Sequence, residues 1–403
     1  MPEIDFAHYA GREQAYIKHC LLAEYLSGWS YRVGSAWDRL VYVDGFAGPW
    51  GSQQPNHGDS SFGIAVQVMS EALLGLSHAR QIGAKGLAIF VEKQPEPFKK
   101  LKAFADRSST QTVRTVALRG RFTTNIPAIQ KLVSDAGGKA FKFVFLDQKG
   151  WAGAPMEQLR SFLTERSCEV LFNLMTSFLT RFVDTEDRAE SYRRLFGRDG
   201  VLEKIRQLPK GTGEREEAAV REYCISLREL CGFKYVAEAV ILKPGTEKVL
   251  YYLVFATNHH KGVEVFKRAE MKASQLQDEI RYESRVEATN QPELLFAGQA
   301  PKSIVASQLH ERYIAKARRK TGAALLAAPS TGAEFSQLYC EALAFPLVTP
   351  QDLHAWLEDW ATRHWIEFHL ALKDGEKRKK PSADRDDRIV VLKRDSIAES
   401  AKA

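Results

Sequence analysis

Three acidic residues close short apolar segments of the sequence, and their placement indicates a ligand site. Asp44, Glu92 and Asp147 each end a run of apolar and β-branched residues that is typical of a buried strand. In an open α/β sheet, ligands bind beyond the carboxyl ends of the strands, where such acids come together. The first acid leads into a glycine-containing turn, whose backbone can bend tightly and approach a ligand closely. The turn reads Gly45-Phe46-Ala47-Gly48-Pro49-Trp50-Gly51.

The spacing of this turn excludes two common phosphate-binding loops. No Lys-Ser/Thr pair follows the glycines, which excludes a Walker A loop, and G-x-G-x-x-G is not satisfied either. A Phe-x-Gly-x-x-Gly turn after an acid is closer to the methionine loop of S-adenosylmethionine (SAM) methyltransferases. The alternative is an ordinary junction between a strand and a helix.

We therefore expect SAM to lie across the tips of the first, second and fourth strands. Glu92 can accept hydrogen bonds from both ribose hydroxyls of a nucleoside, as acids do in dinucleotide folds; the alternative is an exposed acid at a strand end. Asp147 lies next to the donor methyl group if the sheet order is as predicted. The predicted cofactor-binding residues are Asp44, Gly45, Phe46, Ala47, Gly48, Pro49, Glu92 and Asp147.

The elements that position these residues alternate between strands and helices. Strands alternate with helices over residues 40–175, which predicts a parallel sheet with right-handed crossovers. Two later strands, about 235–243 and 249–256, are joined by turn residues at 243–247. A hairpin that closes a parallel sheet favours the seven-stranded methyltransferase variant of the Rossmann-like α/β fold. We expect this domain to span 1–265, with a helical insertion at about 183–230.

The rest of the chain is predicted to form a smaller α+β unit. We expect a helical connector over 266–325, a winged helix-turn-helix domain over 326–395 and a flexible tail over 396–403. Two helices, 333–344 and 350–363, precede strands at 365–370 and 388–392 that flank a long basic tip. Four basic residues of this tip could contact phosphates, although an exposed lysine-rich loop also serves solubility. They are Lys377, Arg378, Lys379 and Lys380.

Composition limits the class of protein. With 44% hydrophobic and 27% charged residues the chain is globular, and its net charge of +7 favours an anionic partner such as DNA or RNA. No stretch approaches the length of a membrane span, and the N-terminus lacks the pattern of a secretion signal, so we expect a cytoplasmic protein. The five cysteines are scattered and never in C-x-x-C spacing, which predicts neither disulfides nor a metal site.

Taken together, these segments resemble the three-Cys-motif partner protein (TcmP) family over about residues 10–270. The resemblance is carried by the turn after Asp44, by Glu92, and by Phe145-Leu146-Asp147-x-x-Gly150-Trp151. It continues through Glu169-Val170-Leu171-Phe172-Asn173 to Tyr251-Tyr252-Leu253-Val254-Phe255-Ala256-Thr257-Asn258-His259. The resemblance implies a SAM-dependent methyltransferase-like fold, a winged helix-turn-helix domain, and a partner whose three-cysteine motif suggests radical-SAM chemistry.

One departure from the family pattern bears on catalysis. The family has Asp-Pro-aromatic-Gly after the fourth strand, whereas this chain has Gln148 and Lys149 at the second and third positions. A lysine beside a sulfonium is electrostatically unfavourable unless it is screened. Lys149 therefore either faces an anionic substrate or marks changed or lost chemistry. Trp151 either offers a stacking surface or belongs to the core.

Three functions remain open on this evidence. The first is a methyltransferase that acts on a nucleic acid or nucleotide-type substrate with its partner, with Asp147, Lys149 and Trp151 as catalytic candidates. The second is a catalytically silent SAM-binding or Rossmann module that recruits DNA or the partner through its winged helix. The third is a regulator or inhibitor of that partner.

Overall fold

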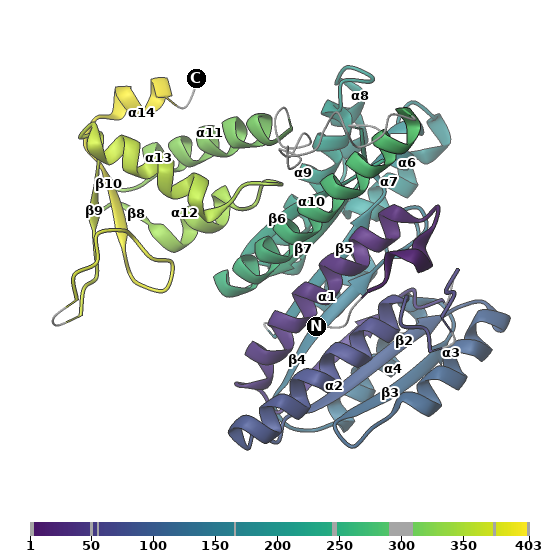
Figure 1. Ribbon diagram of the computed structural model, residues 1–403. Helices are drawn as coiled ribbons and strands as arrows, with labels where there is room; N and C mark the ends of the chain where they lie inside the picture. The colour runs from purple at the N-terminus through teal and green to yellow at the C-terminus, as the bar shows by residue number, and fades with distance from the viewer. Residues whose placement is uncertain are drawn as a thin grey trace.

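The architecture comes from a computed structural model of the whole chain (Figure 1). The structure describes residues 4–48, 51–54, 56–164, 167–243, 248–289, 309–373 and 376–400. Pro49, Trp50, the predicted turn at 244–247 and the last three residues lie outside this part of the chain.

A seven-stranded sheet forms the centre of the larger domain, in the order β3-β2-β1-β4-β5-β7-β6. Strands β1 to β5 are parallel, and β7 runs antiparallel between β5 and β6. The predicted seven-stranded α/β fold is thus confirmed. The strands are β1 (Arg39–Asp44), β2 (Lys85–Glu92), β3 (Val113–Arg119), β4 (Ala140–Leu146), β5 (Cys168–Leu174), β6 (Tyr235–Leu242) and β7 (Val249–Thr257).

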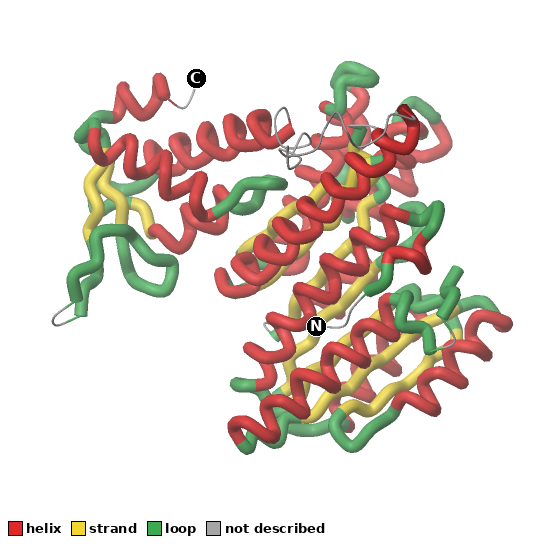
Figure 2. The backbone as a smooth tube through the Cα atoms, in the orientation of Figure 1, coloured by secondary structure: helices red, strands yellow, loops and turns green. Residues whose placement is uncertain are grey.

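Helices cover both faces of this sheet (Figures 1 and 2). On one face, α1 (Glu13–Gly34) lies between α10 (His260–Thr289) and α2 (Ser61–Arg80), and α3 (Pro95–Ser108) packs its Phe104 against Phe62 of α2. On the other face, α5 (Met156–Leu163) packs between α4 (Phe122–Asp135) and α9 (Glu214–Cys231). By length and apolar composition alone α2 could cross a membrane, but 56% of that window is buried inside the protein.

The stretch between β5 and β6 is helical. It contains α6 (Thr176–Arg181), the short helix η2 (Glu186–Arg188), α7 (Ala189–Phe196), α8 (Val201–Arg206) and α9. Because α9 packs on β6 and β7, it is part of the layer that covers the sheet and not a separate insertion. The predicted insertion therefore corresponds to α7 and α8 together with this covering helix.

The C-terminal unit contains helices and a small antiparallel sheet. Its elements are α11 (Glu311–Ala327), β8 (Ala333–Glu334), α12 (Phe335–Ala342), α13 (Pro350–Thr362), β9 (Ile366–His369), β10 (Arg388–Val391) and α14 (Arg394–Ser400). The strand order is β8-β10-β9. The predicted flexible tail is wrong for residues 396–400, since they belong to α14, where Ile397 is buried and Ser400 accepts a hydrogen bond from Trp360.

This unit packs against the open side of the large sheet. The edge strand β6 donates its Glu238 amide to the carbonyl of Ala344 at 2.9 Å, which satisfies part of an otherwise unpaired edge. Lys267 and Glu270 of α10 form a buried ion pair in the larger domain. Glu270 Oε1 also accepts a hydrogen bond from the Leu347 amide of the C-terminal unit at 2.8 Å. The two units are therefore joined by buried polar contacts.

Candidate functional site

The three predicted acids lie at one edge of the sheet, at the carboxyl ends of adjacent strands. Asp44 pairs in register with Phe90 of β2 on one side and with Phe145 of β4 on the other. Glu92 and Asp147 therefore extend two residues beyond Asp44, on either side of the turn that follows it. The structure brings these acids to the same edge, as the spacing of the sequence predicts.

Asp44 organises the turn that follows β1. Its carboxylate is fully buried, with Oδ1 accepting from the Phe46 amide at 3.0 Å and Oδ2 from the Ser61 hydroxyl at 2.6 Å. Burial raises the pKa of Asp44 to about 6, against the opposing effect of these hydrogen bonds. Because both oxygens bind the protein itself, the side chain fixes the backbone of the turn in place.

Gly45 lies in a closely packed part of this turn. Its amide donates to the Phe145 carbonyl at 3.0 Å, and a Cβ at this position would come within 2.7 Å of Leu146 Cδ2. The Ala47 amide donates to the Val91 carbonyl at 2.9 Å. The turn is thus held against both neighbouring strands, with Gly48 following it.

Glu92 is buried at the tip of β2. Its Oε1 accepts from the Gln94 amide at 2.6 Å, and its backbone carbonyl accepts from the Gly120 amide at 3.0 Å. These contacts hold the carboxylate at the sheet edge beside the β1 turn, where the sequence places it.

Asp147 is held by two side chains that the sequence analysis did not anticipate. It forms an ion pair with Lys18 of α1, and its Oδ1 accepts from Asn173 Nδ2 of β5 at 2.6 Å. The Lys18 ammonium and the Asn173 amide lower the pKa of Asp147, although burial acts to raise it. The side chain of Asp147 keeps 24% of its surface exposed, so it remains accessible at the edge.

A signal for Lys18 was present in the sequence. Leu21, Leu22 and Tyr25 follow it by three, four and seven residues, so a helix over this segment places Lys18 on its apolar face. A buried lysine needs an anionic partner, but the sequence alone does not say which of many carboxylates it meets.

Gln148 lies deep in the site without a hydrogen-bond partner. It is 2% exposed, and neither its amide nitrogen nor its amide oxygen is bonded within the described part of the chain. A Cβ at Gly153 would come within 2.8 Å of Gln148 Oε1 and 2.9 Å of the Phe46 ring, so both side chains close on Gly153. An orphaned buried amide beside the β1 turn marks a place where a ligand group can supply the missing hydrogen bonds.

The two other catalytic candidates are placed differently. Lys149 is exposed. Trp151 is buried, donates Nε1 to Ser191 Oγ at 2.7 Å, and packs against Phe182 and Tyr192. The structure thus supports the interpretation of Trp151 as a core residue that anchors the helices after β5, and not as a stacking surface.

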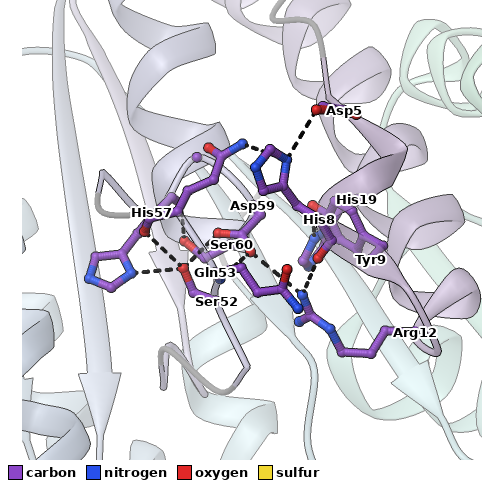
Figure 3. A network of polar contacts seen from close by, with 12 residues as sticks. Asp5, His8, Tyr9, Arg12, His19, Ser52, Gln53, His57, Asp59 and Ser60 are labelled. Atoms are coloured by element: carbon purple, nitrogen blue, oxygen red, sulfur yellow. Dashed lines mark hydrogen bonds and ion pairs between the residues drawn. The ribbon is translucent and has the colours of Figure 1, made fainter.

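A polar network joins the loop after the β1 turn to the N-terminal segment (Figure 3). Asp59 accepts from the Ser52 hydroxyl at 2.6 Å and from the Gln53 amide at 2.7 Å, and Arg12 lies 3.5 Å from it. The pKa of Asp59 is lowered because these hydrogen bonds outweigh its burial. The network fixes the loop to the start of α1, the helix that carries Lys18.

The four basic residues of the C-terminal tip do not share one environment. Arg378 forms an ion pair with the buried Asp387, and Lys380 pairs with Glu358 of α13. Lys377 and Lys379 are exposed, and the described residues provide no ion pair for either. Two of the four are therefore paired with acids, and two are exposed.

No group of three or more His, Cys, Asp or Glu side chains suited to a metal ion occurs among the described residues. All five cysteines are free.

Comparisons with known proteins find likeness in structure but not in sequence. No protein-family model matches the chain, and no curated protein matches it. The O-methyltransferase from Bacillus cereus, solved in complex with SAH, shares 9% identity over 58% of this chain and 80% of that chain, with a TM-score of 0.30. The O-methyltransferase TomG from Streptomyces achromogenes, involved in tomaymycin synthesis and solved with SAM, shares 12% identity over 60% and 79%, also with a TM-score of 0.30.

Sequence identities and TM-scores this low say nothing about activity. The fold is assigned from the strand order of the sheet. An antiparallel β7 between β5 and β6, beside five parallel strands, is the arrangement that distinguishes methyltransferases from dehydrogenases. The fold is methyltransferase-like.

Proposed function

We propose that the carboxyl edge of the sheet binds SAM and that the protein is a SAM-dependent methyltransferase. The observation that carries this proposal is the convergence of the β1 turn, Glu92 and Asp147 at adjacent strand ends. In this arrangement the backbone from Phe46 to Gly48 holds the amino-acid end of the cofactor, and Glu92 holds the ribose.

The residues at this edge suit such a ligand. A Cβ at Gly45 would crowd Leu146 and Phe122, and the Gln148 amide offers an unused donor and acceptor beside the turn. When bound, SAM supplies an electrophilic methyl group on a positively charged sulfur. Asp147 remains ionised because its pKa is lowered, so it acts by orienting the acceptor and balancing positive charge. For the same reason Asp147 is a weak base and does not readily take a proton from the acceptor.

The finer parts of the proposal rest on the resemblance to the TcmP family and on charge. We propose a nucleic acid or nucleotide-type substrate, a partner with a three-cysteine motif, and a winged helix-turn-helix role for the C-terminal unit, in a cytoplasmic protein. The net charge of +7 and the exposed Lys377 and Lys379 support an anionic partner. Co-expression with the partner followed by co-purification tests the pairing.

Calorimetric titration of the full chain with SAM tests the cofactor assignment. Replacing Glu92 by Ala removes two charge-assisted hydrogen bonds to the ribose, which costs on the order of 2–4 kcal/mol of binding. Glu96→Ala is the matched control, because Glu96 lies near Glu92 in the chain but is exposed in a surface ion pair with Lys99. Equal SAM affinity in wild type and Glu92→Ala would refute the placement.

The alternative function is a catalytically silent binding module. One observation favours it: Lys18 and Asn173 already bind both oxygens of Asp147. Transfer of labelled methyl from SAM to nucleic acid or to the partner distinguishes the two. SAM binding without transfer to either would favour the silent module, including one that regulates its partner.

A further inference from the structure

A cavity of about 880 Å³ lies at the opposite edge of the sheet from the proposed cofactor site. Its lining comes from the C-terminal half of α1, the end of α2, the first residues of β4 and β5, and the junction of β7 with α10. In a parallel sheet these strand starts lie at the edge away from the carboxyl ends. The volume is that of a pocket for a small organic molecule.

Glu169 forms the floor of this cavity, and the part of the chain that the structure describes supplies no cationic partner for it. It is buried, with Oε2 accepting from the Tyr25 hydroxyl at 2.5 Å and Oε1 from the Thr257 hydroxyl at 2.7 Å. A Cβ at Gly262 would come within 2.4 Å of Oε1, so the start of α10 lies directly against this oxygen. None of the described residues forms an ion pair with it. Burial therefore raises the pKa of Glu169 to about 7.

A buried carboxylate whose only partners are hydroxyl groups has no positive charge nearby to balance its negative charge when it is ionised. Buried charges in proteins are normally paired, since the cost of removing them from water is otherwise large. A cation that entered the cavity would both pair with Glu169 and favour its ionised form. The floor therefore selects a ligand with a positively charged hydrogen-bond donor.

The walls of the cavity are aromatic. The ring of Phe141 contacts those of Trp29 and Trp37, with centroid distances of 6.3 Å and 5.1 Å and both pairs close to edge-on. Aromatic faces attract ammonium groups and also pack against flat apolar rings. Trp37 already binds one cation in this way, because Lys139 Nζ lies 4.4 Å from its ring centroid.

Two of the three Lys and Arg side chains that line the cavity, Arg32 and Lys261, are paired with acids, and the third, Arg80, is exposed to solvent. Arg32 lies 3.6 Å from Glu264, and Lys261 pairs with both Glu264 and Asp384. Burial and neighbouring cations lower the pKa of His259, which keeps it neutral at neutral pH. A cationic ligand can therefore pass the mouth to reach the acid at the floor.

We propose that this cavity binds a small aromatic amine, with its ammonium group against Glu169 and its ring against Trp29, Trp37 and Phe141. The site is separate from the carboxyl edge, so it does not depend on the function proposed above.

Calorimetry with three indole compounds tests the proposal on the full chain, at a pH above the pKa of Glu169. Tryptamine carries the ammonium, indole-3-propionate carries a carboxylate on the same ring, and tryptophol is neutral. We expect tryptamine to bind at least about 10-fold more tightly than either analogue, as one charge-assisted contact would give. Equal binding of the three compounds, or no binding of tryptamine at millimolar concentration, overturns the proposal.

Two variants separate this cavity from the cofactor edge. Glu169→Gln keeps the size of the side chain but removes its charge, and we expect it to weaken tryptamine binding about 10-fold or more while SAM affinity is unchanged. Glu92→Ala should do the opposite. Tryptamine binding that survives in Glu169→Gln, or that disappears in Glu92→Ala, contradicts the assignment.

A third variant keeps the proposal testable if Glu169→Gln does not fold. Trp37→Leu removes one aromatic wall at a partly exposed position and leaves the floor intact. We expect a several-fold loss of tryptamine affinity, as a lost cation–π contact predicts. Unchanged affinity in Trp37→Leu excludes the aromatic wall from recognition.

Discussion

At the scale of single residues, the ion pair of Lys18 with Asp147 determines what Asp147 can do. A carboxylate between an ammonium and an amide keeps its negative charge to low pH, because both neighbours favour the ionised form. It can orient an acceptor and balance the charge of a sulfonium, but it takes up a proton only reluctantly. An acceptor at this site therefore has to be nucleophilic already, or has to lose its proton elsewhere.

Replacing Lys18 by Met should show how much this pair stabilises the fold. The lowered pKa of Asp147 contributes stability above the unfolded value of 3.8, and this contribution is lost as the pH falls through the folded pKa. We expect Lys18→Met to cost about 1–3 kcal/mol near neutral pH, and less in acid. Urea unfolding at both pH values measures the difference, with Lys18→Arg as the control that keeps the charge. The same loss at both pH values would rule out the charge as its cause.

Catalysis itself is tested at Asp147 and Lys149. We expect Asp147→Ala to abolish methyl transfer while SAM binding is largely kept, because in the proposed mechanism Asp147 orients the acceptor, and the β1 turn and Glu92 supply most contacts to the cofactor. Lys149 is exposed, so we expect Lys149→Ala to weaken substrate binding more than SAM binding. Labelled methyl transfer and calorimetry on both variants in parallel give the two readouts. Full activity in Asp147→Ala would remove Asp147 from the mechanism.

The sequence predicts some of the site residues and not others, for a physical reason. Asp44, Glu92 and Asp147 each end an apolar run, and strand ends of a parallel sheet converge whatever the details of packing. Lys18 and Asn173 reach Asp147 only through the tertiary fold, across 129 and 26 residues of sequence respectively. Spacing along the chain contains no information on such contacts.

At the scale of elements, α1 connects the two edges of the sheet. Lys18, near its start, lies at the carboxyl edge, whereas Tyr25 and Trp29 further along line the cavity at the amino edge. The helix is closely enclosed: a Cβ at Gly28 would come within 2.8 Å of Val265 in α10, and one at Gly34 within 2.7 Å of Leu76 in α2. The sequence predicts a covering helix here, but which residues this helix presents at each edge of the sheet follows only from how it is packed.

The long connection between β9 and β10 should contribute unequally to nucleic-acid binding. Lys377 and Lys379 are exposed, so their replacement by Gln should each reduce the slope of log K against log salt by about 0.9. Lys380→Gln should do less, because Lys380 already pairs with Glu358. Fluorescence anisotropy with a labelled duplex over a salt series measures these slopes. Binding that does not depend on salt, or equal effects at all three lysines, would favour a protein-docking role.

Arg378 serves a different purpose in the same connection. It pairs with Asp387, whose side chain is fully buried and also accepts from the amides of Ser382 and Ala371, both at 2.7 Å. The four basic residues cannot be told apart from the sequence, because it does not show which of them pairs with a buried acid. Arg378→Gln would thus disturb the conformation of the connection and is unsuitable as a test of phosphate contact.

At the scale of the whole molecule, several buried acids couple stability to pH. Burial raises the pKa of Asp44 from 3.8 to about 6, and the pKa values of Glu169 and Glu238 from 4.5 to about 7. The folded protein therefore holds protons that the unfolded chain has released, and stability falls as the pH rises across this range. Asp147 and Asp59 have lowered pKa values and act in the opposite direction. The pH profile of the wild type is a sum of these effects, and a single variant is needed to isolate one of them.

Glu169→Gln isolates the contribution of Glu169. The uncharged amide does not titrate, so any packing or hydrogen-bond cost of the substitution, next to Tyr25 and Thr257, is the same at every pH. In the wild type, Glu169 ionises in the unfolded chain but stays protonated in the folded protein between pH 4.5 and about 7, so the stability of the fold decreases progressively over this range. We therefore expect the stability of Glu169→Gln relative to wild type to rise over this range by up to about 3 kcal/mol, at 1.36 kcal/mol per pKa unit. Chemical unfolding of both proteins across the range measures this change. A difference that stays constant with pH would mean that Glu169 titrates alike in the folded and unfolded chains, and that the floor of the cavity is better solvated than its burial implies.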